Sequence, residues 1–411
     1  MKPQEWDEVV IDELCETIID CVNKTAPVVD FPTPYKMIRT TNVRDGWISL
    51  SSVKYVDHAT YLLWTRRQTP KKGDVILTRE APLGEVGMLR GDDKVFLGQR
   101  LVSYRVNPKK LDNRFLLYAF QGDCLRAQIK ALGSGSTVEH MRVPDAKNLK
   151  VFLPPLASQK KIGSILAAYD DLIENNTRRI EILEEMARRL YEEWFVQFRF
   201  PGHEGVVFED DVPQGWSRVR LDSVAEVNPE AISPKNAPDE IMYVDISSVS
   251  TRQVNKLQRL EFSEAPGRAR RKVISGDVVW SCVRPALRSY ALIIDPPPNT
   301  IVSTGFAVVR ADSVPFSYLY QVLGSDQFVS YLDNHATGAA YPAVKASDFE
   351  AAEVVLPCKN LLAQFDGAVL PMLKMIHVLR LKNNNLQSQR DLLLPKLISG
   401  EIDVSDIPMP T

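Results

Sequence analysis

Hydrophobic residues in the middle of the chain recur in alternating steps of four and three. This spacing is the seam of a coiled coil, and the stretch contains no Gly or Pro between Ser164 and Phe200. It therefore predicts one long helix over residues 158–200, which at ~1.5 Å per residue spans roughly 60 Å. One seam residue, Asn176, is polar. The others are Ile162, Leu166, Tyr169, Ile173, Ile180, Leu183, Ala187, Leu190 and Trp194.

The same four–three pattern returns 203 residues later, near the C-terminus. Its seam positions are Phe365, Val369, Met372, Ile376, Leu379, Asn383, Leu386, Arg390, Leu393 and Leu397. Because an apolar seam needs a partner, we expect the two helices to pair, and a pseudo-twofold between equal halves makes them antiparallel.

In the register that brings the two seam asparagines together, Trp194 faces Phe365 and Asn176 faces Asn383. A buried amide without a partner costs on the order of 1–3 kcal/mol, whereas paired amides fix the register. The alternative is that both asparagines face solvent at the edges of the seam.

The globular parts of the chain also repeat at the offset of 203. Lys72-Gly73-Asp74-Val75 aligns with Ser275-Gly276-Asp277-Val278, and Leu153-Pro154 aligns with Leu356-Pro357. Within each repeat, short apolar runs predict strands, and one longer run predicts a helix. The predicted strands are 75–77, 102–106, 151–153, 278–280, 306–309 and 354–356, and the predicted helices are 113–132 and 317–332.

We therefore predict an α+β fold with two pseudo-repeated α/β globules, separated by an antiparallel pair of long helices. A turn-rich linker rich in Pro, Gly and acidic residues joins the halves. In chain order, the predicted segments are a first globule (1–157), a central helix (158–200), a linker (201–215), a second globule (216–357) and a C-terminal helix with a tail (358–411).

Composition indicates where the protein is located in the cell more clearly than what it does. The 411 residues are 45% hydrophobic and 25% charged, with a formal net charge of −2, which neither indicates nor excludes nucleic-acid binding. The five cysteines form no C-x-x-C pair, the N-terminus is acidic, and no apolar run approaches ~18 residues. We expect a cytoplasmic protein that neither is secreted nor spans a membrane.

Basic clusters precede the Gly-Asp-Val motif in both halves, and further cations and small-residue loops follow it. Flexible cations in turns can reach phosphates, Arg can read guanine edges, and small-residue loops allow close backbone approach. For any single Arg, the alternative is an ordinary solvated surface charge. The candidate DNA-binding residues are Arg66, Arg67, Lys71, Lys72, Arg79, Ser134, Ser136 and Thr137 in the first half, and Arg268, Arg270, Arg271, Lys272, Arg284, Arg288, Thr337, Tyr341 and Lys345 in the second.

The sequence contains no convincing catalytic or metal-binding constellation. No P-loop occurs, and the histidines have no metal-ligand spacing. Asp295-Pro296-Pro297-Pro298 is similar to an amino-methyltransferase motif but lacks the final aromatic residue, so we interpret it as a turn between strands. Asp170-Asp171 and Glu184-Glu185 are similar to catalytic carboxylate pairs, but they flank the seam and we expect them to be solvated or to face a partner. We predict no catalytic residue and no metal ligand.

Several motifs resemble the DNA-specificity subunit of type I restriction–modification enzymes. They are the central Leu153-Pro154-Pro155-Leu156-x-x-Gln159-x-x-Ile162 with the following Asp170-Asp171-x-Ile173, the run Leu183 to Phe195, and the tail Leu393 to Ile402. The resemblance covers the whole chain, including its duplication. The second copy departs from the pattern at Cys358-Lys359, where a Pro is missing.

The resemblance implies that each globule is a target-recognition domain reading one half of a split site in double-stranded DNA. It also implies that the helices set the gap between the halves and dock two methyltransferase subunits, with restriction subunits joining through the complex. This chain would bind no cofactor, since S-adenosylmethionine, ATP and Mg are expected on partner subunits. A non-catalytic two-module scaffold for protein interactions is the alternative.

Overall fold

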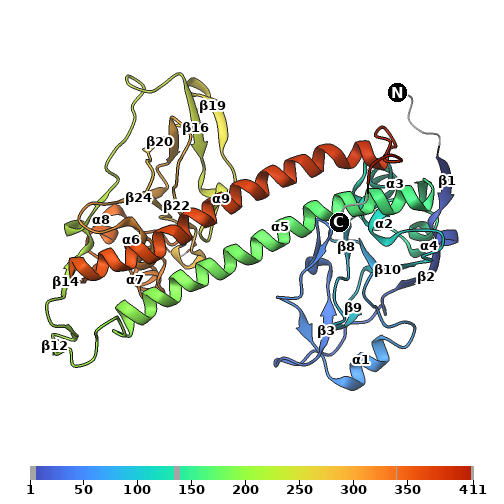
Figure 1. Cartoon of the computed structure of the whole chain (residues 1–411), viewed down its shortest axis with the longest axis horizontal. Helices are drawn as coiled ribbons and strands as arrows, with labels where there is room; N and C mark the ends of the chain where they lie inside the picture. Colours follow the sequence, from blue (N-terminus) through green and yellow to red (C-terminus); the bar gives the residue numbers. More distant parts are fainter. Residues whose placement is uncertain (1–5, 134–138, 339, 409–411) are drawn as a thin grey trace. The chain divides into compact units, whose positions relative to one another are not determined.

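The structure is a computed structural model that describes residues 6–133, 139–338 and 340–408 (Figure 1). They form two compact units. Unit 1 comprises the described residues of Met1–Asn175 and Asn383–Thr411, and unit 2 comprises Asn176–Lys382. Each long helix is divided between the units, whereas we predicted helices as segments of their own. The predicted five-segment boundaries stay a prediction.

Unit 1 is built on a four-stranded antiparallel sheet of order β2-β10-β7-β8. A second sheet, β6-β3-β9, contains a parallel β3–β9 pair, and β1 pairs with β11. The strands are β1 (Asp7–Val10), β2 (Cys15–Asp20), β3 (Tyr35–Ile38), β4 (Val43–Arg44), β5 (Trp47–Ile48), β6 (Lys54–Tyr55), β7 (Val75–Arg79), β8 (Leu83–Met88), β9 (Lys94–Leu97), β10 (Leu101–Val106) and β11 (Lys150–Leu153).

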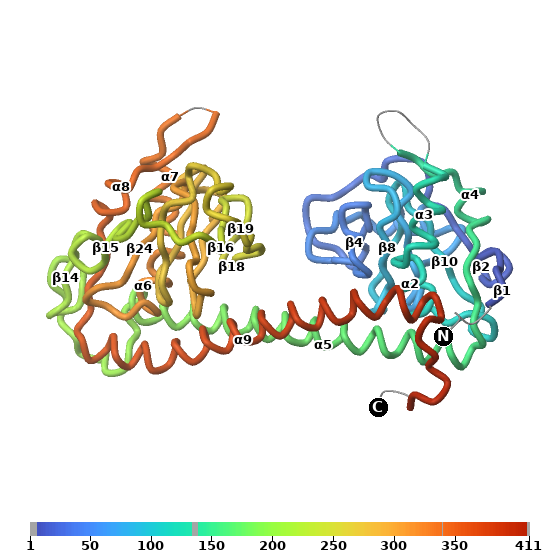
Figure 2. The backbone as a smooth tube through the Cα atoms, turned by 90° about the horizontal axis from the view of Figure 1, so that it is seen from above, coloured from blue at the N-terminus to red at the C-terminus, as the bar shows by residue number. Residues whose placement is uncertain are grey.

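Helices cover the main sheet of unit 1 and connect it to the long helices. Helix α2 contributes Phe115 and Phe120 to the same buried core as Ile162 of α5 and Leu397 of α9. The helices are α1 (His58–Trp64), α2 (Asn113–Gln121), α3 (Asp123–Leu132), α4 (Val143–Lys147), α5 (Leu156–Tyr191) and α9 (Lys359–Ile398), the last two shared with unit 2. Figure 2 shows α2 between the sheet strands and the long helices within this unit.

Unit 2 has two four-stranded sheets, β15-β24-β21-β22 and β19-β16-β23-β20. Its strands are β12 (Phe208–Glu209), β13 (Val212–Pro213), β14 (Ser217–Arg220), β15 (Ala225–Val227), β16 (Glu240–Val244), β17 (Val249–Ser250), β18 (Gln253–Val254), β19 (Gln258–Glu261), β20 (Ala269–Lys272), β21 (Val278–Ser281), β22 (Tyr290–Leu292), β23 (Thr300–Ser303), β24 (Phe306–Ala311) and β25 (Glu353–Leu356). Its helices are α6 (Phe316–Gly324), α7 (Asp326–His335) and α8 (Ala346–Glu350).

The internal repeat is confirmed element by element. Helices α2, α3 and α4 of unit 1 return as α6, α7 and α8 of unit 2, each displaced by 203 positions, and β11 returns as β25 at the same offset. The predicted strands are all present, and the α+β fold class is confirmed.

The two predicted globule helices are each two helices. The run 113–132 breaks at Gly122, and the run 317–332 breaks at Ser325, whose hydroxyl caps α7 by accepting a hydrogen bond from Phe328 N. The predicted central helix also ends early, because α5 stops at Tyr191 and a π-helical turn, Glu192–Val196, follows.

Within each unit, the segments of α5 and α9 pack along the predicted seam. In unit 2, the Trp194 and Phe365 rings lie 5.9 Å apart, which confirms that predicted facing pair. Ile180, Ile376 and Leu379 belong to the same core. Early residues of α5 pack with late residues of α9 in unit 1, so the segments are antiparallel there too.

One charged residue beside the seam differs from expectation, and the polar seam residue Asn383 makes a hydrogen bond within unit 1. Asp170, which we expected at the solvated flank of the seam, is buried and accepts hydrogen bonds from Tyr118 Oη and Arg390 Nη1, each at 2.6 Å. Asn383 Nδ2 donates to the Ile173 carbonyl at 3.4 Å, within unit 1. Asn176 belongs to unit 2, so the predicted Asn176–Asn383 pair stays a prediction.

Helix α9 is apolar enough to pass a simple test for a membrane span, by length and composition alone. Its buried residues Phe365, Val369 and Leu379 lie in the core of unit 2, on the stripe that packs against α5. A single buried stripe is the pattern of a helix that packs within a protein core.

Candidate DNA interface

A buried Asp–Arg pair explains the Gly-Asp motif of both repeats. Asp74 accepts two hydrogen bonds from the Arg105 guanidinium, at 2.9 and 2.7 Å, and Asp277 accepts two from Arg310, at 2.8 and 2.9 Å. Both carboxylates are almost fully buried, so each needs this charge partner. The motif therefore anchors the start of β7 and β21, beside the predicted cations.

In unit 1, the predicted basic cluster lies in the loop between α1 and β7. Arg66, Lys71 and Lys72 are exposed, and Arg67 forms a surface ion pair with Asp20 at 2.7 Å. Exposed ion pairs contribute little stability, so this cluster can exchange its partners for phosphates at small cost.

Arg79 is placed differently from the prediction. Its side chain is 9% exposed and donates from Nη1 to the Met141 carbonyl at 3.0 Å. A side chain held there supports the end of β7 rather than presenting donors to a base. We therefore correct the prediction of Arg79 as a guanine-reading residue.

In unit 2, the four predicted cations before the Gly-Asp motif lie on β20 or directly before it, and their contacts differ. Arg268 is exposed and pairs with Asp245 at 2.5 Å, and Lys272 pairs with Glu230 at 2.7 Å. Arg270 stacks its guanidinium over the Phe262 ring at 5.1 Å. Arg271 is half-buried and donates hydrogen bonds to Asn228 and the Phe306 carbonyl, so its role is structural. We therefore also correct the prediction of Arg271 as a DNA-binding residue.

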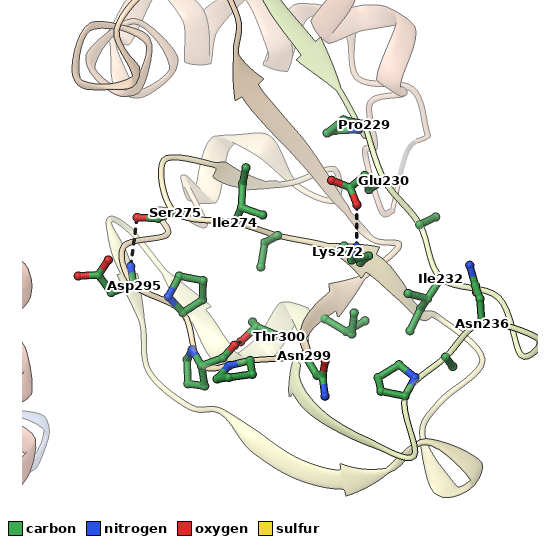
Figure 3. Close-up of a pocket in the computed structure, with 18 residues that line it drawn as sticks. Pro229, Glu230, Ile232, Asn236, Lys272, Ile274, Ser275, Asp295, Asn299 and Thr300 are labelled. Atoms are coloured by element: carbon green, nitrogen blue, oxygen red, sulfur yellow. Dashed lines mark hydrogen bonds and ion pairs between the residues drawn. The ribbon is translucent and has the colours of Figure 1, made fainter.

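Lys272 lies at the wall of an open cavity of about 960 Å³ in unit 2 (Figure 3). Loops 229–238 and 295–299 contribute most of the lining, and Ser275 Oγ accepts a hydrogen bond from Asp295 N at 3.2 Å. Hydrogen bonds from Lys272 and Arg310 lower the pKa of Glu230 to about 2. The triple-proline segment joins β22 to β23, which confirms its interpretation as a turn.

Among the described residues there is no group of three or more His, Cys, Asp or Glu side chains that could hold a metal ion.

The segment after β21 carries Arg284 and Arg288, one on each side of a short 3₁₀ turn, Pro285–Leu287. Both have left-handed backbone conformations, with φ of 51° and 54°. Arg288 pairs with Asp326 at 2.5 Å, whereas the Arg284 guanidinium lies 4.6 Å from the centre of the Tyr341 ring.

The small-residue loops are described only in part. Ser134, Ser136 and Thr137 lie outside the described residues. In unit 2, Thr337 forms a bridge with Ala343, Tyr341 is exposed, and Lys345 is exposed at the start of α8. Of the predicted residues, Arg284 and Tyr341 are thus brought into direct contact from segments 57 positions apart.

Two residues near this contact carried no sequence signal. Leu287 is 63% exposed at the tip of the 3₁₀ turn, and Ala340 accepts a hydrogen bond from Arg284 Nη2 at 3.5 Å. No sequence signal singles out this turn, because its left-handed backbone is visible only in the structure.

Known proteins resemble this chain over most of its length. The family described as the type I restriction modification DNA specificity domain matches residues 3–185. The MjaIX specificity subunit of Methanocaldococcus jannaschii is 25% identical over 82% of this chain and 79% of its own length. The chain is therefore similar to type I restriction–modification specificity subunits, and residues 3–185 match their DNA specificity domain. The predicted resemblance is confirmed.

Other relatives agree over most of the chain. The MjaVIII specificity subunit of the same archaeon is 20% identical over 98% of this chain and 95% of its own length. A crystal structure of the type I S subunit from M. genitalium superposes with a TM-score of 0.61 at 16% identity, covering 97% of this chain and 99% of that one, which supports the fold. The prediction of a non-catalytic subunit agrees with these names, since each is a specificity subunit.

Proposed function

We propose that this chain recognises a bipartite site in double-stranded DNA, and that each unit reads one half. The observation that carries the proposal is the duplication. Residues 3–185 match a DNA specificity domain, and helices α2 to α4 and strand β11 of that part of the chain recur in unit 2 at the constant offset of 203. Two copies of one reading module are suited to two half-sites.

The exposed cations support DNA as the ligand of both units. Arg66, Lys71 and Lys72 in unit 1, and Arg268 and Lys272 in unit 2, precede the same buried Asp–Arg pair. Cations that precede the same motif in both modules give each a means of contacting phosphates, although these cations do not align position by position. The acidic partners of the unit 2 cations are exposed or partly exposed, so DNA phosphates can replace them.

We further propose that α5 and α9 set the unread gap between the half-sites. Their 36 and 40 residues correspond to about 50–60 Å at the α-helical rise. That length is equivalent to about one and a half turns of B-DNA. Insertion of four residues into both helices is expected to lengthen the gap, and an unchanged gap would refute a ruler.

The helices also carry a surface suited to the proposed methyltransferase subunits. Ile182 and Met186 lie one turn apart on α5 and are exposed, and so are Met375, Val378 and Leu381 on α9. Exposed apolar side chains at helical spacing are typical of a surface that a partner covers. Two methyltransferase subunits on these helices, with restriction subunits joining through them, complete the proposed assembly.

In this assembly, the partner subunits carry out the catalysis. S-adenosylmethionine, ATP and Mg bind to those subunits and not to this chain, and the complex acts in the cytoplasm. The rival interpretation is a scaffold that binds only proteins.

An electrophoretic mobility shift with and without a methyltransferase subunit tests the proposal. We expect binding that is selective for one bipartite sequence and that weakens steeply with salt, because phosphate contacts release counterions. A methylation map of the host genome then identifies the sequence. Binding to partner proteins without selective DNA binding would support the scaffold instead.

A further inference from the structure

A turn with a residue at positive φ occurs at equivalent positions of both units, although the unit 1 turn also contains a cis peptide bond, Ala81–Pro82. In unit 1 it joins β7 to β8 at Ala81, with φ of 48°, and in unit 2 it follows β21 at Arg284, with φ of 51°. The two residues are 203 positions apart, and each precedes a proline. Residues other than Gly are disfavoured at positive φ and persist there only when their surroundings determine the conformation.

Equivalent hydrogen bonds hold the two turns. An antiparallel bridge joins Glu80 to His140 in unit 1 and Val283 to Ala343 in unit 2. The next bond along is also repeated, from Met141 N to the Arg79 carbonyl at 3.0 Å and from Val344 N to the Cys282 carbonyl at 2.9 Å. Each of these positions repeats at the offset of 203. The backbone platform is therefore common to both units, while the side chain that it presents is Ala in one and Arg in the other.

The Arg284 side chain uses one donor in a long hydrogen bond, from Nη2 to the Ala340 carbonyl at 3.5 Å, and its other side-chain donors have no hydrogen-bond partner among the described residues. Its guanidinium lies over the Tyr341 ring at 4.6 Å, and its backbone N–H donates to the Pro342 carbonyl at 2.7 Å. Stacking uses the face of the guanidinium, whereas its N–H donors lie at the edge. Arg284 is exposed and forms no ion pair within the described part of the chain, in contrast to Arg288.

The surroundings of Arg284 also suit contact with a base. The segment between α7 and α8, which carries Tyr341, projects from unit 2 on the side away from the long helices (Figure 2). Tyr341 is 68% exposed, and Leu287 is exposed on the same turn. A fixed Arg beside an exposed aromatic ring and an apolar side chain can combine base hydrogen bonding with stacking or apolar contact.

We propose that this turn is a specificity-determining position, and that Arg284 donates its paired N–H groups to O6 and N7 of a guanine in the half-site read by unit 2. Ala81, at the equivalent position in unit 1, has no donor, so the first half-site is read there without this contact. The inference rests on the proposed function, and it specifies one recognised base, the guanine, and the residue that contacts it, Arg284.

The test uses the full chain assembled with its methyltransferase subunits. Arg284→Ala is expected to lose the preference for guanine at one position of one half-site, by roughly 5- to 150-fold, the range for a bidentate Arg–guanine contact. Arg284→Gln is expected to shift that position towards adenine, which Gln can read in the same way. The readouts are competition binding to oligonucleotides that vary at each position, and sequencing of methylated sites.

A matched control removes the same charge elsewhere in unit 2. Arg259, on β19, is exposed and pairs with Glu240 at 2.6 Å. Arg259→Ala is expected to leave the recognised sequence unchanged. Melting curves of each variant report folding, and the Gln variant retains a side chain of similar reach if Ala destabilises the turn.

The outcomes separate this inference from the proposed function. If Arg284→Ala weakens binding to every sequence equally, Arg284 contacts phosphate and the inference is overturned. If the variant recognises the same sequence as the wild type, it is likewise overturned. If the wild-type complex itself binds DNA without sequence preference, the proposed function fails and this inference fails with it.

Discussion

The buried Asp170 carboxylate provides a test of how unit 1 holds its helices together. Asp170 is 1% exposed, accepts from Tyr118 and Arg390 at 2.6 Å, and has Arg90 Nη2 at 3.9 Å. Removal of one partner of a buried pair costs about 3–5 kcal/mol, because the remaining charge stays desolvated. Arg390 is 15% exposed and Arg90 remains nearby, so we expect the lower end, about 3 kcal/mol, for Arg390→Leu.

The measurement is the free energy of unfolding from urea titration. A loss of about 3 kcal/mol corresponds to a lower midpoint by roughly 1 M for a unit of this size. Hydrogen exchange should place the loss in unit 1. The matched control is Arg67→Leu, which breaks the exposed Arg67–Asp20 pair and is expected to cost less than about 1 kcal/mol.

A compensating variant sharpens the test. The position of Asp170 in the second repeat is Leu373, which is buried without a charge. Asp170→Leu with Arg390→Leu and Tyr118→Phe removes the buried charge together with its two hydrogen-bond partners, and is expected to recover at least half of the loss. A single variant as stable as the wild type, or a triple variant no better than the single, would refute the reasoning.

Three further outcomes follow from the two units. Gly87→Ala is expected to lower the free energy of unfolding by about 1–3 kcal/mol, since its added Cβ would lie 2.5 Å from the Trp47 carbonyl oxygen, and an unchanged melting temperature would contradict this. Glu230 has a pKa of about 2 in the folded chain, against an ordinary value of 4.5. The ionised carboxylate therefore stabilises the folded state above pH 4.5, and this stabilisation is lost as the pH falls towards 2. Glu230→Gln should flatten the pH dependence of the urea midpoint in that range. Burial of much of its side chain raises the pKa of the half-buried Cys15 thiol to about 12. Mass spectrometry after brief alkylation should therefore find the exposed Cys124 modified and Cys15 intact, and equal labelling of the two would contradict this expectation.

Periodic patterns in the sequence predicted the long helices and the duplicated elements, because local sequence largely determines these features. The seam of alternating steps predicted both long helices and the Trp194–Phe365 contact, and the constant offset predicted the duplicated elements. The break at Gly122 was missed because the hydrophobic periodicity runs through it. The solvated assignment of Asp170 failed because its partner Arg390 is 220 positions away.

The candidate site was predictable as a set of positions but not as a set of roles. Arg79 and Arg271 have the same composition cues as Arg284, yet their guanidinium groups bond to Met141 and Asn228, which lie 62 and 43 positions away. Only tertiary structure separates an Arg that supports a turn from one that the turn presents. The equivalence of the two strained turns likewise required backbone angles, which the sequence does not display.

Unit 1 is assembled from both ends of the chain, and this affects how the protein is made. Leu394, Leu397 and Val404 complete its core, and Lys161 Nζ donates to the Ser405 carbonyl at 2.5 Å. During synthesis, the ribosome must first translate all of Asn176–Lys382, which at ~5–20 residues per second takes roughly 10–40 s. The unit that begins translation first is therefore the last to finish folding, and until then its nascent core is exposed to chaperones and proteases.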